Sequence, residues 1–192
     1  MKYSISKVIL LFSMLTAALF SNAQATEQEQ DFLNFFFEQY RPKIDTFYYS
    51  SNLSAGELQN MKESLKRHIA ADNSAEETPF GLQCKDFSVA LSAIDSLQKI
   101  SWHDRVIEKG RLVPEDTLTV LYKKMAQDQM PLDVFGGEIH SFSHPIFLRK
   151  GTICLFYHGS FSSPMDSYGC FYVYKKVGDS WCKLGTLFAV IS

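Results

Sequence analysis

The sequence lacks several patterns that identify a function directly. It has no cluster of lysines and arginines of the kind that nucleic-acid binding requires, and no glycine-rich phosphate-binding loop. It also has no internal repeat, no low-complexity segment and no interdomain linker. Beyond residue 20 no apolar run approaches the roughly 20 residues that span a membrane. We therefore expect neither nucleic-acid binding nor a transmembrane segment in the mature chain.

The first 25 residues have the features of a secretory signal peptide. Lys2 and Lys7 give a positive start, and an apolar run follows from Val8 to Phe20. Ala23-Gln24-Ala25 then supplies a small-x-small cleavage site, with cleavage after Ala23 as the alternative. No cysteine lies at the cleavage point, which argues against a lipid anchor. We expect an exported protein, either periplasmic or secreted.

Residues 26–192 are expected to form one mature domain. Two of the 19 basic residues lie in the signal peptide, so 17 remain against 21 acidic residues, a net charge of −4. A chain of this size buries about 70% of the surface that its unfolded form exposes. It therefore has enough core for a single α+β domain.

The last third of the chain has the pattern of an antiparallel sheet. The apolar and aromatic runs predict strands over Thr152–His158, Gly169–Lys176 and Ser180–Ile191. Gly178-Asp179 is a two-residue hairpin turn, because glycine supplies a positive φ at little cost. This turn places Lys176 opposite Trp181 and Val173 opposite Leu184.

The register sorts the side chains of these strands into two faces. One face is almost entirely apolar and is expected to form the core: Ile153, Leu155, Tyr157, Phe171, Val173, Cys182, Leu184, Phe188 and Val190. The other face is aromatic with polar tips: Cys154, Phe156, His158, Cys170, Tyr172, Tyr174, Trp181 and Lys183.

Helical patterns precede this sheet. A phenylalanine-rich stripe predicts a helix over residues 31–40, and Ser54 with Glu57 forms a capping box that opens a second helix. Pro114 followed by two acidic residues opens another. Residues 89–100 fit a helix better than a strand. In residues 80–84 apolar and other residues alternate as in a short strand, and residues 102–112 have no assigned structure. The whole pattern predicts an α+β fold, with N-terminal helices packed on a C-terminal antiparallel sheet of about four strands.

The four cysteines of an exported chain make disulfides plausible. Cys154 and Cys170 share the aromatic face, so their pairing is our prediction. Cys170 and Cys182 fall on opposite faces of the hairpin and are not expected to pair. The alternative is that all four are small buried hydrophobic residues.

Catalytic and metal-binding patterns are weak. His140-x3-His144 and Cys154-x3-His158 have ligand spacing only in a helix, and two strand residues four apart lie about 13 Å from each other. Ser160 lies in no nucleophile elbow, because Pro164 prevents a helix directly after it. We predict no catalytic residue, no metal and no cofactor. The alternative is a hydrolase whose site is assembled from Cys154, His158 and Ser160.

The aromatic face is the remaining candidate binding site. Its rings are large with polar tips, which can bind a sugar or a peptide at small entropic cost; they are Phe156, His158, Tyr172, Tyr174 and Trp181. The favoured alternative is that a helix or the segment Asp45–Ser51 covers this face. Burial of the rings would therefore exclude an open binding face.

The C-terminal pattern resembles that of small exported bacterial α+β proteins with no established activity. The resemblance lies in Ser143-x-Pro145-x-Phe147, then Gly169-x-x-Tyr172-x-x-x-Lys176, then Trp181 and a final Ile191-Ser192. Helices followed by an antiparallel sheet also resemble the cystatin-like or NTF2-like architecture, an analogy of shape only. We expect a non-enzymatic domain that binds a small ligand or a protein partner in the cell envelope. A structural component of an assembly is a further possibility.

Overall fold

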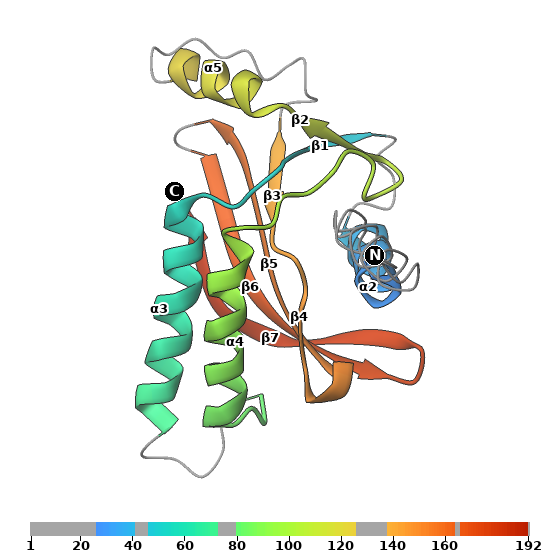
Figure 1. The fold of residues 1–192 in the computed structure, drawn as a ribbon, viewed down its shortest axis with the longest axis vertical. Helices are drawn as coiled ribbons and strands as arrows, with labels where there is room; N and C mark the ends of the chain where they lie inside the picture. Colours follow the sequence, from blue (N-terminus) through green and yellow to red (C-terminus); the bar gives the residue numbers. More distant parts are fainter. Residues whose placement is uncertain (1–25, 41–45, 73–79, 126–137, 164–165, 192) are drawn as a thin grey trace, which may run out of the picture.

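One sheet with helices on both faces forms the framework of the protein. The computed structural model describes residues 26–40, 46–72, 80–125, 138–163 and 166–191 (Figure 1). The helices in these ranges are α2 (Glu27–Tyr40), α3 (Ala55–Asp72), α4 (Cys84–Leu97) and α5 (Glu115–Met125). The strands are β1 (Phe47–Ser50), β2 (Gly110–Val113), β3 (Ile139–Phe142), β4 (Ile146–Leu148), β5 (Ile153–Ser163), β6 (Asp166–Val177) and β7 (Ser180–Ile191). The predicted signal peptide lies outside the described residues.

The sheet is mostly antiparallel, and the α+β class is confirmed. Its strand order is β2-β1-β3-β5-β6-β7, with β4 pairing beside β3 on β5. Among the described strands, the parallel pairs are those that β1 makes with β2 on one side and with β3 on the other. The described residues contain seven strands rather than about four, and the helices do not all precede the sheet. The additional strands β1 and β2 are only four residues long, too short to show a period in sequence.

The C-terminal hairpin has the predicted turn but not the whole predicted register. Gly178 has a φ of +60°, and Lys176 lies opposite Trp181 as expected. Beyond Lys183 the register shifts at two β-bulges, so that Val173 lies opposite Gly185 rather than Leu184. The assignment of Cys182, Leu184 and Val190 to the core is wrong, since Cys182 is exposed and Leu184 and Val190 are 42% and 44% exposed.

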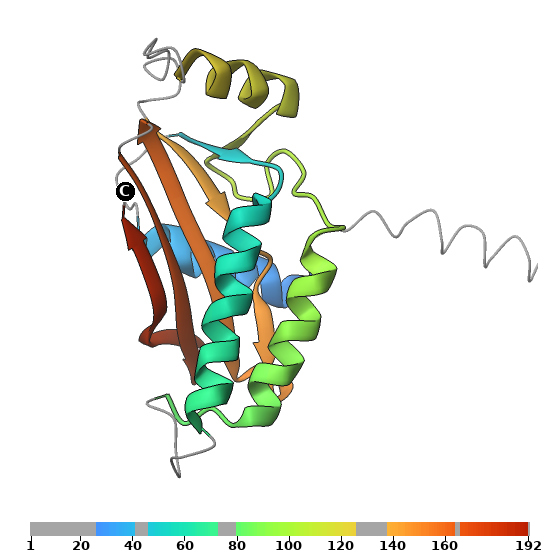
Figure 2. The same cartoon turned by 90° about the vertical axis from the view of Figure 1, so that its left-hand side faces the viewer.

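The faces of β5 and β6 agree with the predicted alternation, and both are buried. Helices α3 and α4 cover the first face, which contributes Ile153, Leu155, Tyr157, Phe171 and Val173 to one core. Helix α2 covers the opposite face with its phenylalanines. Figure 2 shows α3 and α4 in front of the sheet and α2 behind it. In the same part of the chain, no helix is both long and apolar enough to cross a membrane.

Strands β3 and β4 follow each other along β5, separated by a short break. Both pair with β5, and the interruption falls at Ser143-His144-Pro145. The amide of Ser143 donates to the carbonyl of Tyr157 (3.0 Å), and the Ser143 hydroxyl accepts the amide of Tyr157 (3.0 Å). The serine side chain thus satisfies a backbone amide of β5 where the strand beside it is broken.

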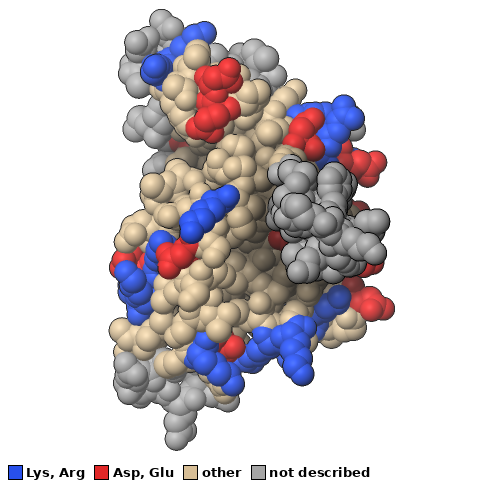
Figure 3. Space-filling model, in the orientation of Figure 1, with Lys and Arg blue, Asp and Glu red and all other residues tan. Residues whose placement is uncertain are grey.

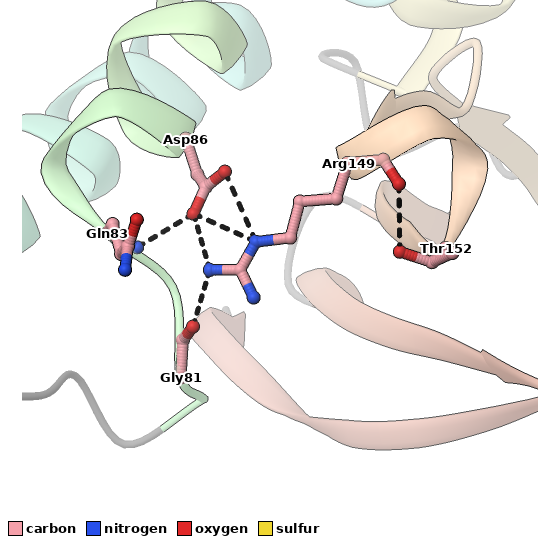
Figure 4. Close-up of polar contacts among 5 residues, drawn as sticks. All are labelled: Gly81, Gln83, Asp86, Arg149 and Thr152. Atoms are coloured by element: carbon pink, nitrogen blue, oxygen red, sulfur yellow. Dashed lines mark hydrogen bonds and ion pairs between the residues drawn. The ribbon is translucent and has the colours of Figure 1, made fainter.

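The start of α4 is fixed by a charged clamp (Figure 4). Asp86 accepts the amide of Gln83, which completes a capping box, and also the guanidinium of Arg149 (2.6 Å). The same guanidinium donates to the carbonyl of Gly81, where φ is +61°. The predicted strand over residues 80–84 is therefore wrong, because the chain turns here and enters a helix at Cys84.

Candidate functional site

The predicted aromatic binding face does not form an open surface. Its five rings are buried, with exposed fractions between 0% and 7%: Phe156, His158, Tyr172, Tyr174 and Trp181. Phe32 of α2 packs edge-on against three of them, with ring centroids 5.0–5.3 Å apart. The aromatic side of the sheet is thus a second core beneath a helix, as the favoured alternative expected.

The predicted disulfide is absent as well. Cys154 lies opposite Tyr174 on the ladder, whereas Cys170 lies opposite His158. The two cysteines are therefore separated by four positions along the strands, about 13 Å. All four cysteines lie in the described part of the chain, and none forms a disulfide.

A groove opens on the other side of the sheet, between helices α3 and α5, the end of β5 and the start of β6. Its volume is about 940 Å³. Residues that carry a hydroxyl group are the most numerous polar residues of its lining, which includes Ser50, Ser54, Ser141, Ser160, Ser163, Ser167, Tyr122, Tyr157 and Tyr168. Its apolar lining includes Leu53, Leu97, Leu118, Phe161 and Val190. In Figure 3 the surface between α5 and the upper ends of α3 and α4 is mainly uncharged.

The floor of the groove is a hydrogen-bonded cluster centred on Glu57. Its carboxylate accepts the amide of Ser54 (2.6 Å), the hydroxyl of Ser141 and the hydroxyl of Tyr157 (3.1 Å). The first bond belongs to the capping box of α3, and the other two join that helix to β3 and β5. Burial, followed by the charge and hydrogen bond of Glu57, raises the pKa of Tyr157 well above its ordinary value. The tyrosine is therefore a neutral donor to Glu57.

Two glycines make room for this cluster. Gly159 and Gly169 face each other across β5 and β6. A Cβ atom at Gly169 would collide with the Tyr157 hydroxyl, and one at Gly159 would lie 2.8 Å from it. Because neither strand has a side chain there, the tyrosine ring can lie over the sheet and reach Glu57.

An aromatic pair forms the opposite wall. Tyr122 of α5 lies 50% exposed, and its ring packs on Phe161 of β5 with centroids 5.3 Å apart and planes tilted by 34°. Burial, together with the charges of Glu57 and Glu115, raises the pKa of Tyr122 to about 12. The hydroxyl of Tyr122 is therefore neutral at ordinary pH.

The charge of the described lining is acidic. It includes Glu57 and Glu115 but no lysine, arginine or histidine. Each acid lies in the first turn of a helix, where a carboxylate offsets the partial positive charge of the helix end. An anionic ligand would meet two carboxylates and no cationic side chain from these residues. The groove therefore suits an uncharged or cationic ligand.

A buried histidine pair lies on the other side of the sheet. Nε2 of His158 is 3.2 Å from Nδ1 of His140, and Nδ1 of His158 is 2.9 Å from the hydroxyl of Tyr168. Glu138 approaches Nε2 of His140 to 3.8 Å. Both histidines are at most 2% exposed, so these contacts form a polar network inside the protein.

The three residues of the alternative hydrolase site are spread along β5, and Cys154 lies apart from the other two. Cys154 is completely buried, its thiol donates to the carbonyl of Leu155 (3.7 Å), and burial raises its pKa well above the ordinary value. It lies four residues from His158 on one strand, about 13 Å away. Ser160 is a cross-strand neighbour of His140, and both ring nitrogens of His158 are within hydrogen-bond distance of His140 and Tyr168.

The histidines do not pair as their spacing in the sequence suggests. His140 pairs with His158 rather than with His144, whose ring stacks on Trp102 with centroids 3.5 Å apart and whose Nδ1 lies 3.1 Å from Glu29. Within the described residues no three His, Cys, Asp or Glu side chains are arranged to hold a metal ion.

Sequence reasoning found the capping role of Glu57 but missed the groove. The bonds from Ser141 and Tyr157 reach Glu57 across 84 and 100 residues, so no local pattern records them. The available signal was the pair Gly159 and Gly169. One directly follows a predicted strand and the other begins the next, and a glycine in such a place often marks the close approach of another side chain, here that of Tyr157.

Comparisons of the chain with protein families, curated proteins and solved structures find no match. Its function is therefore inferred from the geometry of the groove.

Proposed function

We propose that this chain is an exported, non-enzymatic protein of the cell envelope that binds a small ligand in the groove. The supporting observation is the built floor, where Glu57 holds the hydroxyls of Ser141 and Tyr157 in place. Ligand sites usually occupy about 300–1,000 Å³ and combine apolar walls with a few fixed polar groups. A volume of about 940 Å³ with such a lining is compatible with a ligand of that size.

The hydrogen-bonding state of the floor supports a ligand that donates hydrogen bonds. The hydroxyl groups of Ser141 and Tyr157 both donate their hydrogen bond to Glu57. Their remaining capacity is oxygen lone pairs, and a carboxylate is itself only an acceptor. A ligand with hydroxyl or N–H groups satisfies these acceptors, whereas a phosphate or carboxylate leaves them unpaired.

Export rests on the signal peptide pattern of residues 1–25, with Lys2, the apolar run from Val8 and the Ala23-Gln24-Ala25 site. The proposal includes no reaction. The thiol of Cys154 is protonated and buried, and both ring nitrogens of His158 already have polar neighbours.

The experiment is capture of small molecules by the exported protein. The protein is purified, incubated with the small-molecule fraction of the growth medium, and examined by native mass spectrometry. Asn60→Trp places a large ring at an exposed position of the groove lining, and Gln59→Trp places the same ring at its exposed neighbour outside that lining. We expect wild type and Gln59→Trp to retain the same bound mass and Asn60→Trp to lose it.

Equal retention by Asn60→Trp and Gln59→Trp would place the ligand outside the groove and contradict the proposal. Failure of the wild type to retain any small molecule would contradict it as well. Cell fractionation tests export separately, since an exported chain leaves the cytoplasm and loses about 2.7 kDa if residues 1–25 are removed.

A further inference from the structure

We infer that the ligand of the groove is a neutral saccharide whose ring stacks on Tyr122, an inference that rests on the proposed function. A sugar ring presents C–H bonds on its faces and hydroxyl groups around its edge. It therefore needs an aromatic surface on one side and hydrogen-bond acceptors around it. The groove brings these two elements together.

Tyr122 provides the aromatic surface. The residue is 50% exposed although it belongs to a packed helix, and the ring of Phe161 packs against its ring with centroids 5.3 Å apart. A supported ring loses little conformational freedom when a ligand covers it, so its contact area adds directly to affinity. An isolated exposed aromatic residue would need no explanation, but this one forms the wall of a hydroxyl-lined groove.

The floor provides the acceptors. The three donors to Glu57 occupy three of the roughly four lone-pair sites of a carboxylate. One site remains on Glu57, together with lone pairs on the oxygens of Ser141 and Tyr157. The hydroxyls of a sugar can donate to these atoms and accept from other hydroxyls of the lining.

The charges favour a neutral ligand over a cation. Glu57 and Glu115 would attract a cation, but the helix ends at which they lie carry partial positive charge. Glu57 also already shares its charge among three donors. A polyamine remains the competing class, because an ammonium group also donates hydrogen bonds and binds aromatic faces.

The test is a binding panel measured by saturation-transfer difference NMR and calorimetry. The probes are the neutral trisaccharides of β-1,4-linked glucose, β-1,4-linked N-acetylglucosamine and α-1,4-linked glucose. Trigalacturonate is the anionic probe and spermidine the cationic probe. The proteins are wild type, Tyr122→Phe, Tyr122→Ala and the matched control Val120→Ala, which alters an exposed residue of the same helix outside the lining.

We expect at least one neutral trisaccharide to bind, with the strongest saturation on the C–H protons of one ring face. Tyr122→Phe keeps the aromatic surface and should retain affinity within about twofold, as should Val120→Ala. Tyr122→Ala should weaken binding roughly tenfold, a loss of about 1.4 kcal/mol. Thermal melting of each variant checks that α5 remains folded.

Three outcomes would overturn the saccharide inference. Binding of spermidine or trigalacturonate in place of every neutral sugar reassigns the ligand class and leaves the proposed groove function standing. If no probe of the panel binds but Asn60→Trp still abolishes small-molecule capture, the saccharide inference is wrong and the proposed groove function stands. If a sugar binds with the same affinity to wild type, Tyr122→Ala and Asn60→Trp, its site lies elsewhere on the protein. This result would contradict the proposed groove function as well.

Discussion

Replacing Glu57 by alanine tests the hydrogen-bonded cluster that builds the floor of the groove. The change removes the acceptor of three hydrogen bonds, from the Ser54 amide and from the hydroxyls of Ser141 and Tyr157. The two hydroxyl-bearing side chains, Ser141 and Tyr157, are only 7% and 5% exposed in the intact protein. The substitution therefore leaves buried donors without a partner, which costs more than an exposed hydrogen bond.

The expected magnitude follows from these three bonds. Loss of a helix-capping partner costs about 1 kcal/mol. Each buried hydroxyl left unpaired costs about 1–3 kcal/mol, and the low end applies because Glu57 lies at the edge of the groove. We expect Glu57→Ala to lower the free energy of unfolding by about 3 kcal/mol, which corresponds to a fall of about 6–12 °C in melting temperature for a domain of this size.

The assay is urea unfolding followed by circular dichroism, with Glu63→Ala as the matched control. Glu63 lies on the same helix, but its partners Gln59 and Lys66 are exposed surface contacts, so its loss should cost less than about 0.5 kcal/mol. Tyr157→Phe should cost about 1 kcal/mol in the wild type but should recover about 1 kcal/mol after Glu57→Ala, because it then removes an unpaired buried hydroxyl. If Glu57→Ala were no more destabilising than Glu63→Ala, the cluster would not hold α3 to the sheet.

Three further perturbations test other parts of the fold. Burial opposes ionisation of Asp86, but the hydrogen bonds from Arg149 and Gln83 outweigh it and hold the pKa of this carboxyl below its ordinary value. The free energy of unfolding contributed by Asp86 should therefore be full above about pH 5 and fall as the pH drops through the lowered pKa. Asp86→Asn should reduce the pH dependence of the unfolding free energy in urea between pH 5 and 2, and the same pH dependence in variant and wild type would refute this linkage. Gly169→Ala should lower stability by about 2–3 kcal/mol because its Cβ would collide with the Tyr157 hydroxyl, so an unchanged melting temperature would exclude that close approach. Alkylation without reductant should label Cys154 only upon unfolding and add four alkyl groups to the denatured chain, whereas a smaller mass gain would reveal a disulfide.

Features governed by neighbouring residues could be predicted from the sequence. The Gly178 turn depends on one glycine φ, and the capping box of α3 depends on Ser54 and Glu57, three residues apart. The alternation along β5 and β6 follows from strand geometry, and it correctly separated Tyr157 from Phe156. Each of these signals spans fewer than about ten residues.

Features governed by distant packing could not be predicted in this way. The bulges that expose Leu184 accompany a close contact between Gly185 and Phe80, more than 100 residues earlier. The aromatic face gave no sign of whether α2 would cover it or leave it open. The pairing of His140 with His158 depends on the register of β3 against β5, which no spacing in the sequence records.

Glycine amide resonances offer the most direct test that the groove is the binding site. Gly56 and Gly169 line the groove, whereas Gly178 lies in the distant β6–β7 turn. On addition of the small-molecule fraction to ¹⁵N-labelled protein, the amide signals of Gly56 and Gly169 should shift together while that of Gly178 stays in place. A shift at Gly178 alone, or no shift at Gly56 and Gly169 under conditions where a ligand is retained, would show that the ligand binds elsewhere.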